Sequence, residues 1–388
     1  MLNFNYSIPT NIYFGKGKMD SLPKLIKQYG SKILLTYGGG SIKSNGIYDK
    51  VVNLLKENNI EYFELGGVDP NPRITTVREG IKICKENDLN FILALGGGSV
   101  IDCSKTIAAG CYYDGDPWDF FIGKARIKNA LPLGTVVTLA ATGSEMNGNA
   151  VISNIDTEEK YLTYGEALKP KFSILDPVNT FTVPRIQTAA GTADIMSHIF
   201  EQYFSSTEGA YIQDRMAEAL LKTCIKYGPI AVENPENYEA RANLMWTSTL
   251  ALNGLLTYGK ITDWATHGME HELSAIYDIT HGVGLAILTP SWMTYVLDDT
   301  TLDKFVEYGV NVWDIDRTQE KITIAKEAIK MTKEFFISLG IPSTLTEVGI
   351  GEDKLKEMAV KTTKRGPQGN FRKLYEEDVL KIYLSSLK

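Results

Sequence analysis

A short pattern occurs twice in the first hundred residues and limits the folds open to this chain. In both copies a mainly apolar run leads directly into Gly-Gly-Gly-Ser, at residues 38–41 after residues 32–37 (KILLTY) and at residues 96–99 after residues 91–95 (FILAL). Continuous apolar runs of this length are typical of strands that are buried on both faces, as in a parallel sheet covered by helices. The pattern therefore predicts an α/β fold in which glycine loops follow strand ends.

The neighbouring segments continue this alternation. Apolar residues at helical spacing predict a helix over residues 46–58, and a second helix runs through Ile101 and Lys105 after the second glycine loop. Two further strands are expected at residues 135–139 and 172–175. Because strands alternate with helices, we expect a parallel sheet with helices on both faces.

The pattern changes after Pro184. Helical periodicity dominates, as in residues 211–227 and 238–256, and clear strand signals disappear. A chain of 388 residues is long enough for two domains of about 100–200 residues each. We therefore predict an α/β domain at residues 1–182 and an all-α domain at residues 183–388, with Pro177 and Pro184 marking the boundary.

Composition excludes several classes of function. The 40 basic and 47 acidic side chains give a net charge of −7, so the chain has no basic surplus for a nucleic acid. No apolar run approaches the ~20 residues that span a bilayer, and the first residues lack a targeting pattern. No C-x-x-C pair occurs, so we expect reduced thiols and a cytoplasmic protein. The four cysteines are Cys84, Cys103, Cys111 and Cys224.

The glycine loops are suited to phosphate. Glycine lets a phosphate approach the backbone closely, and the free N–H groups at a helix start attract an anion. Neither loop has the G-x-G-x-x-G spacing, and tight strand–helix turns also use glycine for steric reasons alone. A third polar segment, residues 138–145, offers hydroxyl groups at a strand end, although Thr142 or Ser144 could simply cap a helix. Two such loops in one α/β domain, where the sheet is expected to bring strand ends together, favour phosphate binding.

All of the histidines lie in the predicted helical domain. Asp194 precedes His198 by four residues, and His267 and His271 repeat that spacing, so each pair faces one side of a helix. An aspartate with several imidazoles favours a divalent metal site, for which Fe(II), Zn, Co and Ni are suitable. Glu201 is a rival carboxylate, and spacing does not choose between it and Asp194. The four histidines are His198, His267, His271 and His281.

Four segments resemble the iron-containing (group III) alcohol dehydrogenase family. They are residues 176–201 (DPVNTFTVPRIQTAAGTADIMSHIFE), 267–284 (HGMEHELSAIYDITHGVG), 96–105 (GGGSVIDCSK) and 141–145 (ATGSE). The resemblance covers essentially the whole chain and is greatest for the bacterial butanol dehydrogenases that act with NADH or NADPH. It implies a Rossmann-like α/β domain joined to an all-α domain, the architecture that this family shares with dehydroquinate synthase.

The resemblance implies a metal centre and a catalytic residue. One divalent metal, Fe(II) first and zinc as the alternative, would be held by Asp194, His198, His267 and His281. His271 matches a family histidine that lies near the nicotinamide without binding the metal. We therefore expect His271 to be catalytic, as a proton relay, which suits an imidazole pKa of ~6.5.

The resemblance also implies NAD(P)(H) as the cofactor. Relatives that select NAD carry an aspartate in the first glycine loop, where this chain has Gly39, and Ser41 could donate to a 2′-phosphate. We therefore expect NADP(H) to be accepted. Asn149 and Tyr258 match substrate-pocket positions. The implied cofactor residues are Gly38, Gly39, Gly40, Ser41, Asn71, Gly97, Gly98, Ser99, Asp102, Thr138, Thr142, Asn147 and Lys160.

The expected function is the interconversion of small primary alcohols and aldehydes, such as butanol and butanal, by a homodimer. Three alternatives remain. A metal-dependent phosphohydrolase also uses His/Asp clusters, but the paired glycine loops disfavour it. A glycerol-dehydrogenase-like polyol oxidoreductase shares the architecture, but the ordered signature at residues 176–201 argues against it. A non-catalytic binding protein has little support because all four implied metal ligands are present.

Overall fold

The computed structural model describes residues 1–388, and the chain divides into two compact units. The sheet unit comprises residues 7–183 and 235–249, and the helical unit comprises residues 1–6, 184–234 and 250–388. This division differs from a single cut after residue 182 in two segments. The first six residues join the helical unit, where the backbone N–H of Leu2 donates to the carbonyl of Gly259. Residues 235–249 join the sheet unit, where Trp246 packs edge-on against Phe14.

A six-stranded parallel sheet organises the sheet unit, in the order β1-β8-β5-β4-β2-β3. Its strands are β1 (Asn11–Phe14), β2 (Lys32–Tyr37), β3 (Glu61–Leu65), β4 (Phe91–Gly96), β5 (Leu133–Val137) and β8 (Phe172–Leu175). The predicted strands at residues 32–37, 91–95 and 172–175 are confirmed. The strand predicted at residues 135–139 begins and ends two residues earlier, at Leu133 and Val137.

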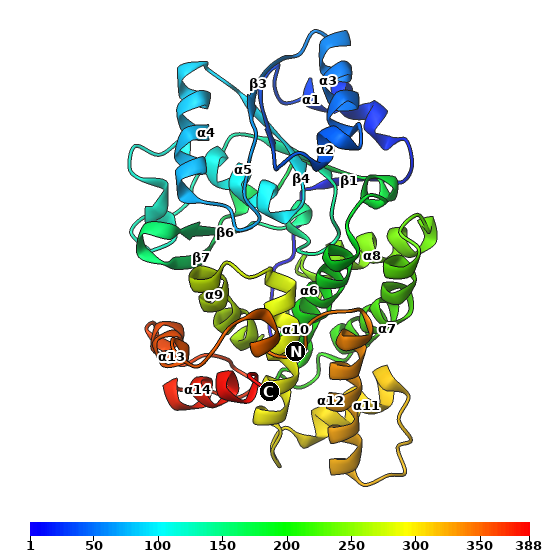
Figure 1. Ribbon diagram of the computed structural model, residues 1–388. Coiled ribbons are helices and arrows are strands. Elements are labelled where there is room, and N and C mark those ends of the chain that lie inside the picture. Colours follow the sequence, from blue (N-terminus) through cyan, green and yellow to red (C-terminus); the bar gives the residue numbers. More distant parts are fainter. The chain divides into compact units, whose positions relative to one another are not determined.

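Helices cover both faces of the sheet, as predicted (Figure 1). One face packs on α1 (Leu22–Ile26), α2 (Ser41–Ser44) and α3 (Ile47–Glu57), and the other packs on α4 (Ile74–Glu86) and α5 (Gly98–Gly110). Successive side chains of a strand point to opposite faces. In β4, Phe91 and Leu93 therefore enter the first core and Ile92 enters the second. Burial on both sides explains why this strand is apolar at every position.

A small antiparallel hairpin also belongs to the sheet unit, and the sequence did not reveal it. It consists of β6 (Asn149–Asn154) and β7 (Glu159–Tyr164), with Glu158 in a left-handed conformation between them. Strands β1 and β3 were missed for a related reason. They lie at the two edges of the sheet and are only partly buried, so their residues form no continuous apolar run.

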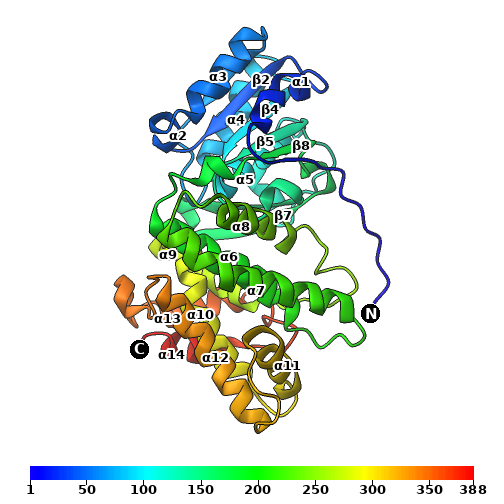
Figure 2. The same ribbon diagram turned by 90° about the vertical axis from the view of Figure 1, so that its right-hand side faces the viewer.

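The helical unit contains no strand of the sheets, in agreement with the predicted all-α domain. Its central helix, α6, is buried from Thr188 to its end and packs against α7 and α10 (Figure 2). The predicted helix at residues 211–227 extends through Pro229 to Glu233. The helices are α6 (Arg185–Tyr203), α7 (Tyr211–Glu233), α9 (Ala265–Tyr277), α10 (His281–Val296), α11 (Leu302–Trp313), α12 (Lys321–Ser338), α13 (Leu355–Thr363) and α14 (Glu376–Ser385).

Helix α8 (Tyr238–Ala251) corresponds to the helix predicted at residues 238–256, which ends five residues earlier than expected. None of the helices in the structure combines the length and the apolar character that crossing a bilayer requires. The four cysteines are free thiols, and all but the half-buried Cys111 are buried, where they pack as small apolar side chains.

Candidate active site

Three helices of the helical unit bring an aspartate and three imidazoles together. Asp194 and His198 lie one turn apart on α6, His267 lies in the first turn of α9, and His281 is the first residue of α10. The Oδ1 atom of Asp194 is 3.2 Å from Nδ1 of His198, 3.9 Å from Nε2 of His267 and 3.8 Å from Nε2 of His281. These are the four residues that the family resemblance implied as metal ligands. Ligand atoms of Asp194, His267 and His281 all lie within 4.8 Å of one another, and His198 lies beside them through its contact with Asp194.

The donor set and spacing of this cluster suit a divalent metal. Ligands of a tetrahedral ion at about 2.0–2.2 Å lie roughly 3.3–3.6 Å from one another, and the distances from Asp194 bracket that range. The ring atoms Nδ1 of His198 and Nε2 of His267 are buried and have no hydrogen-bond partner. Burial first, and then His267 and His281, hold the pKa of His198 well below its ordinary value. The ring is therefore neutral, which is the form that binds a metal.

Two buried glutamates contact the outer nitrogen atoms of the cluster's imidazoles. Oε1 of Glu201 lies 3.0 Å from Nδ1 of His267 and also accepts the backbone N–H of His267 at 2.8 Å. Oε2 of Glu270 likewise contacts the ring atom Nδ1 of His281. A carboxylate behind a metal-binding imidazole sets the ring's tautomer and direction. Sequence spacing left Asp194 and Glu201 as rival ligands, and the geometry puts Asp194 among the ring nitrogens and Glu201 behind His267.

Two residues just before α9 contact the site or fix the start of this helix, and neither was identified from the sequence. Trp264 has a φ of +69°, which is uncommon for a bulky residue, and its ring centroid lies 5.3 Å from that of His267. Asp263 accepts the backbone N–H of Ala265 at the start of α9 and those of Asn370 and Phe371 in the C-terminal region. These contacts fix the start of the helix that carries His267. No periodicity or spacing in the sequence marked either residue.

His271 lies at the edge of the histidine cluster. It follows His267 by one turn on α9, and its ring centroid lies 6.5 Å from that of His267 and 5.8 Å from that of His281. The ring is half-buried. Its catalytic role stays a prediction.

The residues expected to bind a dinucleotide, all in the sheet unit, follow the carboxyl ends of adjacent strands. Strands β2 and β4 are neighbours in the sheet. From β2 the chain continues to β3 on one side of this pair, and from β4 it continues to β5 on the other side, so the direction of strand addition reverses between β2 and β4. Ligands of open α/β sheets bind at such a reversal. The loop at residues 38–41 follows β2, the loop at residues 97–99 follows β4, and Thr138 and Thr142 follow β5.

The second glycine loop leads into a helix whose start is available to an anion. Gly97 precedes α5, no side chain caps the helix, and its first backbone bond runs from the N–H of Ile101 to the carbonyl of Gly97. A Cβ atom at Gly98 would lie 2.4 Å from Oγ1 of Thr142, so only glycine permits this contact. A Cβ atom at Gly39 would meet nothing within 4 Å, which leaves the first loop open.

The remaining predicted residues are distributed between the two units. In the sheet unit, Ser99 donates to the carbonyl of Pro70, next to the buried Asn71, and Lys160 is buried on β7. Asn149 is the first residue of β6. In the helical unit, the ring of Tyr258 packs on Phe4 and Tyr6. The substrate-pocket roles of Asn149 and Tyr258 stay predictions.

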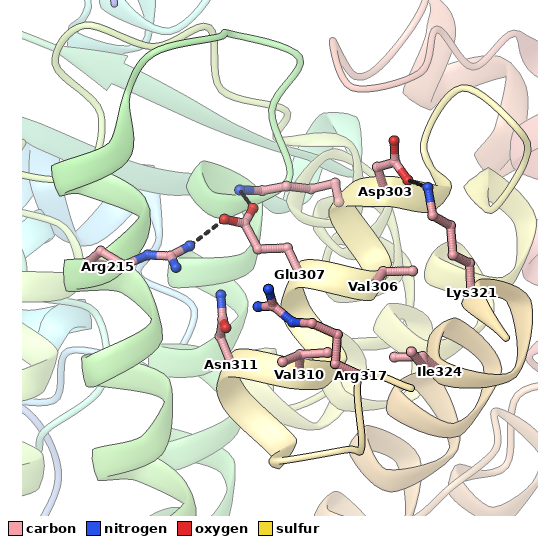
Figure 3. Close-up of a pocket in the computed structure, with 10 residues that line it drawn as sticks. Arg215, Asp303, Val306, Glu307, Val310, Asn311, Arg317, Lys321 and Ile324 are labelled. Carbon is pink, nitrogen blue, oxygen red and sulfur yellow. Dashed lines mark hydrogen bonds and ion pairs between the residues drawn. The ribbon is translucent and has the colours of Figure 1, made fainter. Parts of the chain in front are cut away.

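A pocket of about 640 Å³ in the helical unit lies among α7, α11 and α12 and contains none of the predicted site residues (Figure 3). Its charged groups are largely paired. Glu307 contacts both Arg215 and Lys304, and Lys321 contacts Asp303 at 2.7 Å. The pocket is lined by Arg215, Asp303, Lys304, Val306, Glu307, Val310, Asn311, Arg317, Lys321 and Ile324.

Known protein families match the chain in both of its units. Residues 9–177 match the model of the iron-containing alcohol dehydrogenases, and residues 188–387 match that of the C-terminal part of the Fe-containing alcohol dehydrogenase family. The chain is 61% identical over 388 residues to NADH-dependent butanol dehydrogenase A of Clostridium acetobutylicum, with both chains covered completely. It is 42% identical over 369 residues to an NADPH-dependent aldehyde reductase of Escherichia coli, over 94% of each chain.

A solved structure agrees with the fold. The crystal structure of NADH-dependent butanol dehydrogenase A from Thermotoga maritima superimposes with a TM-score of 0.96 at 41% identity, covering 100% of this chain and 99% of that one. The predicted architecture, a parallel-sheet α/β domain followed by a helical domain, is therefore confirmed.

Proposed function

Because the chain belongs to the iron-containing alcohol dehydrogenase family, we propose that it interconverts butanal, or aldehydes of similar size, with the primary alcohol. At the coarser level it is an NAD(P)H-dependent oxidoreductase of alcohols and aldehydes. One observation supports the proposal of butanal-sized substrates. The cluster of Asp194 with three imidazoles is complete in a chain that is 61% identical over its full length to an NADH-dependent butanol dehydrogenase.

We propose that Asp194, His198, His267 and His281 hold one divalent ion, with Fe(II) preferred over Zn. Such an ion supplies a Lewis acid for the oxygen atom of the alcohol or aldehyde. Glu201 and Glu270 orient the rings of His267 and His281.

The cofactor supplies the hydride, and the chain's own residues bind and orient it. We propose that Gly97, Gly98 and Ser99 bind the pyrophosphate at the start of α5, and that the loop at residues 38–41, with Asn71, binds the adenosine ribose. The uncapped helix start and the open space at Gly39 support these assignments. Asp102, just beyond the first turn of α5, belongs to the same pyrophosphate region. We propose that Thr138 and Thr142 contact the phosphate and the nicotinamide side, and that Lys160 reaches the nicotinamide ribose, with Asn147 as a further cofactor residue.

We propose that His271 carries the proton that leaves or reaches the alcohol oxygen. Its half-buried ring lies beside two proposed ligands, at a position where it can exchange protons with solvent. We also propose that Asn149 and Tyr258 contribute to the substrate pocket.

We further propose a cytoplasmic homodimer. Four free thiols suit a reducing compartment. Large apolar side chains are exposed together on the N-terminal segment at Met1, Leu2, Phe4 and Tyr6, and an exposed apolar patch is typical of a protein interface. Light scattering at micromolar concentration should give twice the mass of one chain, and a monomer would contradict this assignment.

The function is tested by following NADH and NADPH absorbance with butanal. Chelator-treated protein is compared with protein restored by Fe(II) or Zn under anaerobic conditions. We expect oxidation of the nicotinamide only after a metal is restored. No oxidation by folded, metal-loaded protein would contradict the proposal. Turnover of a phosphate ester without a nicotinamide would favour the hydrolase alternative, and turnover of glycerol in place of butanol would favour the polyol alternative.

A further inference from the structure

The buried lysine on α5 joins two parts of the proposed dinucleotide site. Lys105 has an exposed fraction of 0%, and its Nζ donates to Oγ of Ser144 at 2.8 Å, to Oδ1 of Asn147 at 3.0 Å and to the carbonyl of Asn149 at 2.8 Å. An ammonium group has three donors, so this group is fully used. All three acceptors belong to the short segment that leads into β6.

Two carboxylates, the buried Glu145 and the partly buried Asp102, balance the charge of this lysine. Asp102, one turn earlier on α5, accepts the hydroxyl of Ser144 at 2.5 Å and the backbone N–H of Val151 at 2.9 Å. Burial lowers the pKa of Lys105 to about 8, and attraction to Asp102 and Glu145 opposes that shift. Burial likewise raises the pKa of both carboxyl groups, and Lys105 opposes it. Each charge therefore depends on its neighbours for stability in the interior.

The same segment is anchored from a distant part of the chain. The hydroxyl of Thr249 on α8 donates to Oε1 of Glu145 at 2.5 Å, and the hydroxyl of Ser173 on β8 donates to the carbonyl of Glu145. The segment also touches the glycine loop, because Gly98 lies directly against Thr142. The position of residues 142–149 relative to the first turn of α5 is thus set by a buried polar network with Lys105 at its centre.

We propose that Lys105 is a positioning residue for the dinucleotide, which holds residues 142–149 at the correct distance from the phosphate-binding start of α5. This inference rests on the proposed function. Lys105 does not touch the cofactor itself, since it is enclosed and its three donors are used within the chain. It acts through Asn147 and Thr142, both of which are proposed cofactor residues.

The test replaces the lysine with an apolar side chain of similar length, Lys105→Met, in metal-loaded protein. We expect the dissociation constant and the KM for NADH to rise by about tenfold or more, because three hydrogen bonds and a compensating charge are lost. The kcat at saturating NADH and butanal should change less than the KM does. The bound metal, measured by elemental analysis, should remain the same because the ligands lie in the helical unit.

Lys260→Met is the matched control. Lys260 is a buried lysine of the helical unit and pairs with Asp214 at 2.5 Å. Its loss should lower the free energy of unfolding while the dissociation constant for NADH stays as in the wild type. If Lys105→Met behaved in the same way, with unchanged NADH affinity and only reduced stability, the positioning role would be wrong.

If Lys105→Met does not fold, Ser144→Ala tests whether the network around Lys105 affects dinucleotide binding. It removes the hydroxyl between Lys105 and Asp102 and leaves every charge in place. We expect weaker NADH binding with unchanged metal content, and wild-type NADH binding would overturn the inference. Failure of the proposed function has a different signature, because the wild-type protein would then bind neither NADH nor NADPH.

Discussion

The carboxylate of Glu201 on α6 holds His267 on α9 at two points, with Oε1 3.0 Å from the ring Nδ1 and 2.8 Å from the backbone nitrogen. This pairing turns Nε2 of His267 toward Asp194. An imidazole held in this way is pre-oriented and more basic toward a metal. The arrangement joins the two helices at the candidate metal centre and leads to the first prediction.

Glu201→Gln should weaken metal binding without removing a proposed ligand. The amide keeps the size of the side chain but loses the charge behind His267, and such changes lower metal affinity by about 10–100-fold. Competition with a chelator measures the affinity. Glu218→Gln is the matched control, since Glu218 is a buried glutamate of the same unit that bonds Tyr203 and Arg215. Equal metal affinity of the wild type and Glu201→Gln would contradict the orienting role.

Asp194→Ala and His267→Ala should each lose metal and activity together. The loss of one of four ligands removes the Lewis acid, which contributes several kcal/mol, so we expect the rate to fall by about three orders of magnitude. Elemental analysis and NADH oxidation with butanal give the two readouts, and circular dichroism reports folding. A folded, metal-free and fully active Asp194→Ala protein would refute the ligand assignment.

Gly39→Asp should discriminate against NADPH. No atom lies within 4 Å of a Cβ at this position, so the side chain fits, and its charge would repel a 2′-phosphate. We expect the KM for NADPH to rise by about tenfold while the KM for NADH changes little, which corresponds to about 1.4 kcal/mol. Gly39→Asn has the same size without the charge and serves as the control. Wild-type protein that fails to use NADPH at saturating aldehyde would contradict the expected acceptance of that cofactor.

The pKa of Lys105 makes a prediction about stability and pH. Burial lowers this pKa to about 8, whereas the unfolded value is about 10.4. The unfolded state therefore holds this proton more tightly, and stability rises as the pH passes from the folded value toward the unfolded one. Between pH 8 and 9.5 the free energy of unfolding of the wild type should gain about 1–2 kcal/mol relative to Lys105→Met. Denaturant titration measures the difference, and a difference independent of pH would disprove the shift.

Leu93→Ala should destabilise the sheet unit strongly. Leu93 is fully buried on the central strand β4, and removal of its side chain should cost about 2–5 kcal/mol. The control is Leu162→Ala on β7, where the side chain is half exposed and the cost should stay below about 1 kcal/mol. Thermal or denaturant unfolding followed by circular dichroism checks both values. Equal losses would mean that burial on both faces of the sheet does not dominate stability.

Elements that lie almost wholly in the interior could be predicted from their residues alone. Strands β2, β4 and β8 could be predicted because burial on both faces favours apolar residues at most of their positions. Spacing alone also predicted that Asp194 and His198 share one face of a helix. The ligand set and the cofactor class, in contrast, came from resemblance to a family and not from any single spacing.

Features that depend on partners far away in the chain could be seen only in the folded protein. Edge strand β1 forms because β8 offers it hydrogen bonds, since its own four residues carry no strong pattern. The choice between Asp194 and Glu201 required the approach of α9 to α6, and the contact of Glu270 with His281 required α10. Periodicity reports which residues share a face of one element, whereas the distance between elements depends on how their side chains pack. Only the packed chain could therefore show which carboxylate faces the imidazole nitrogens and which stands behind them.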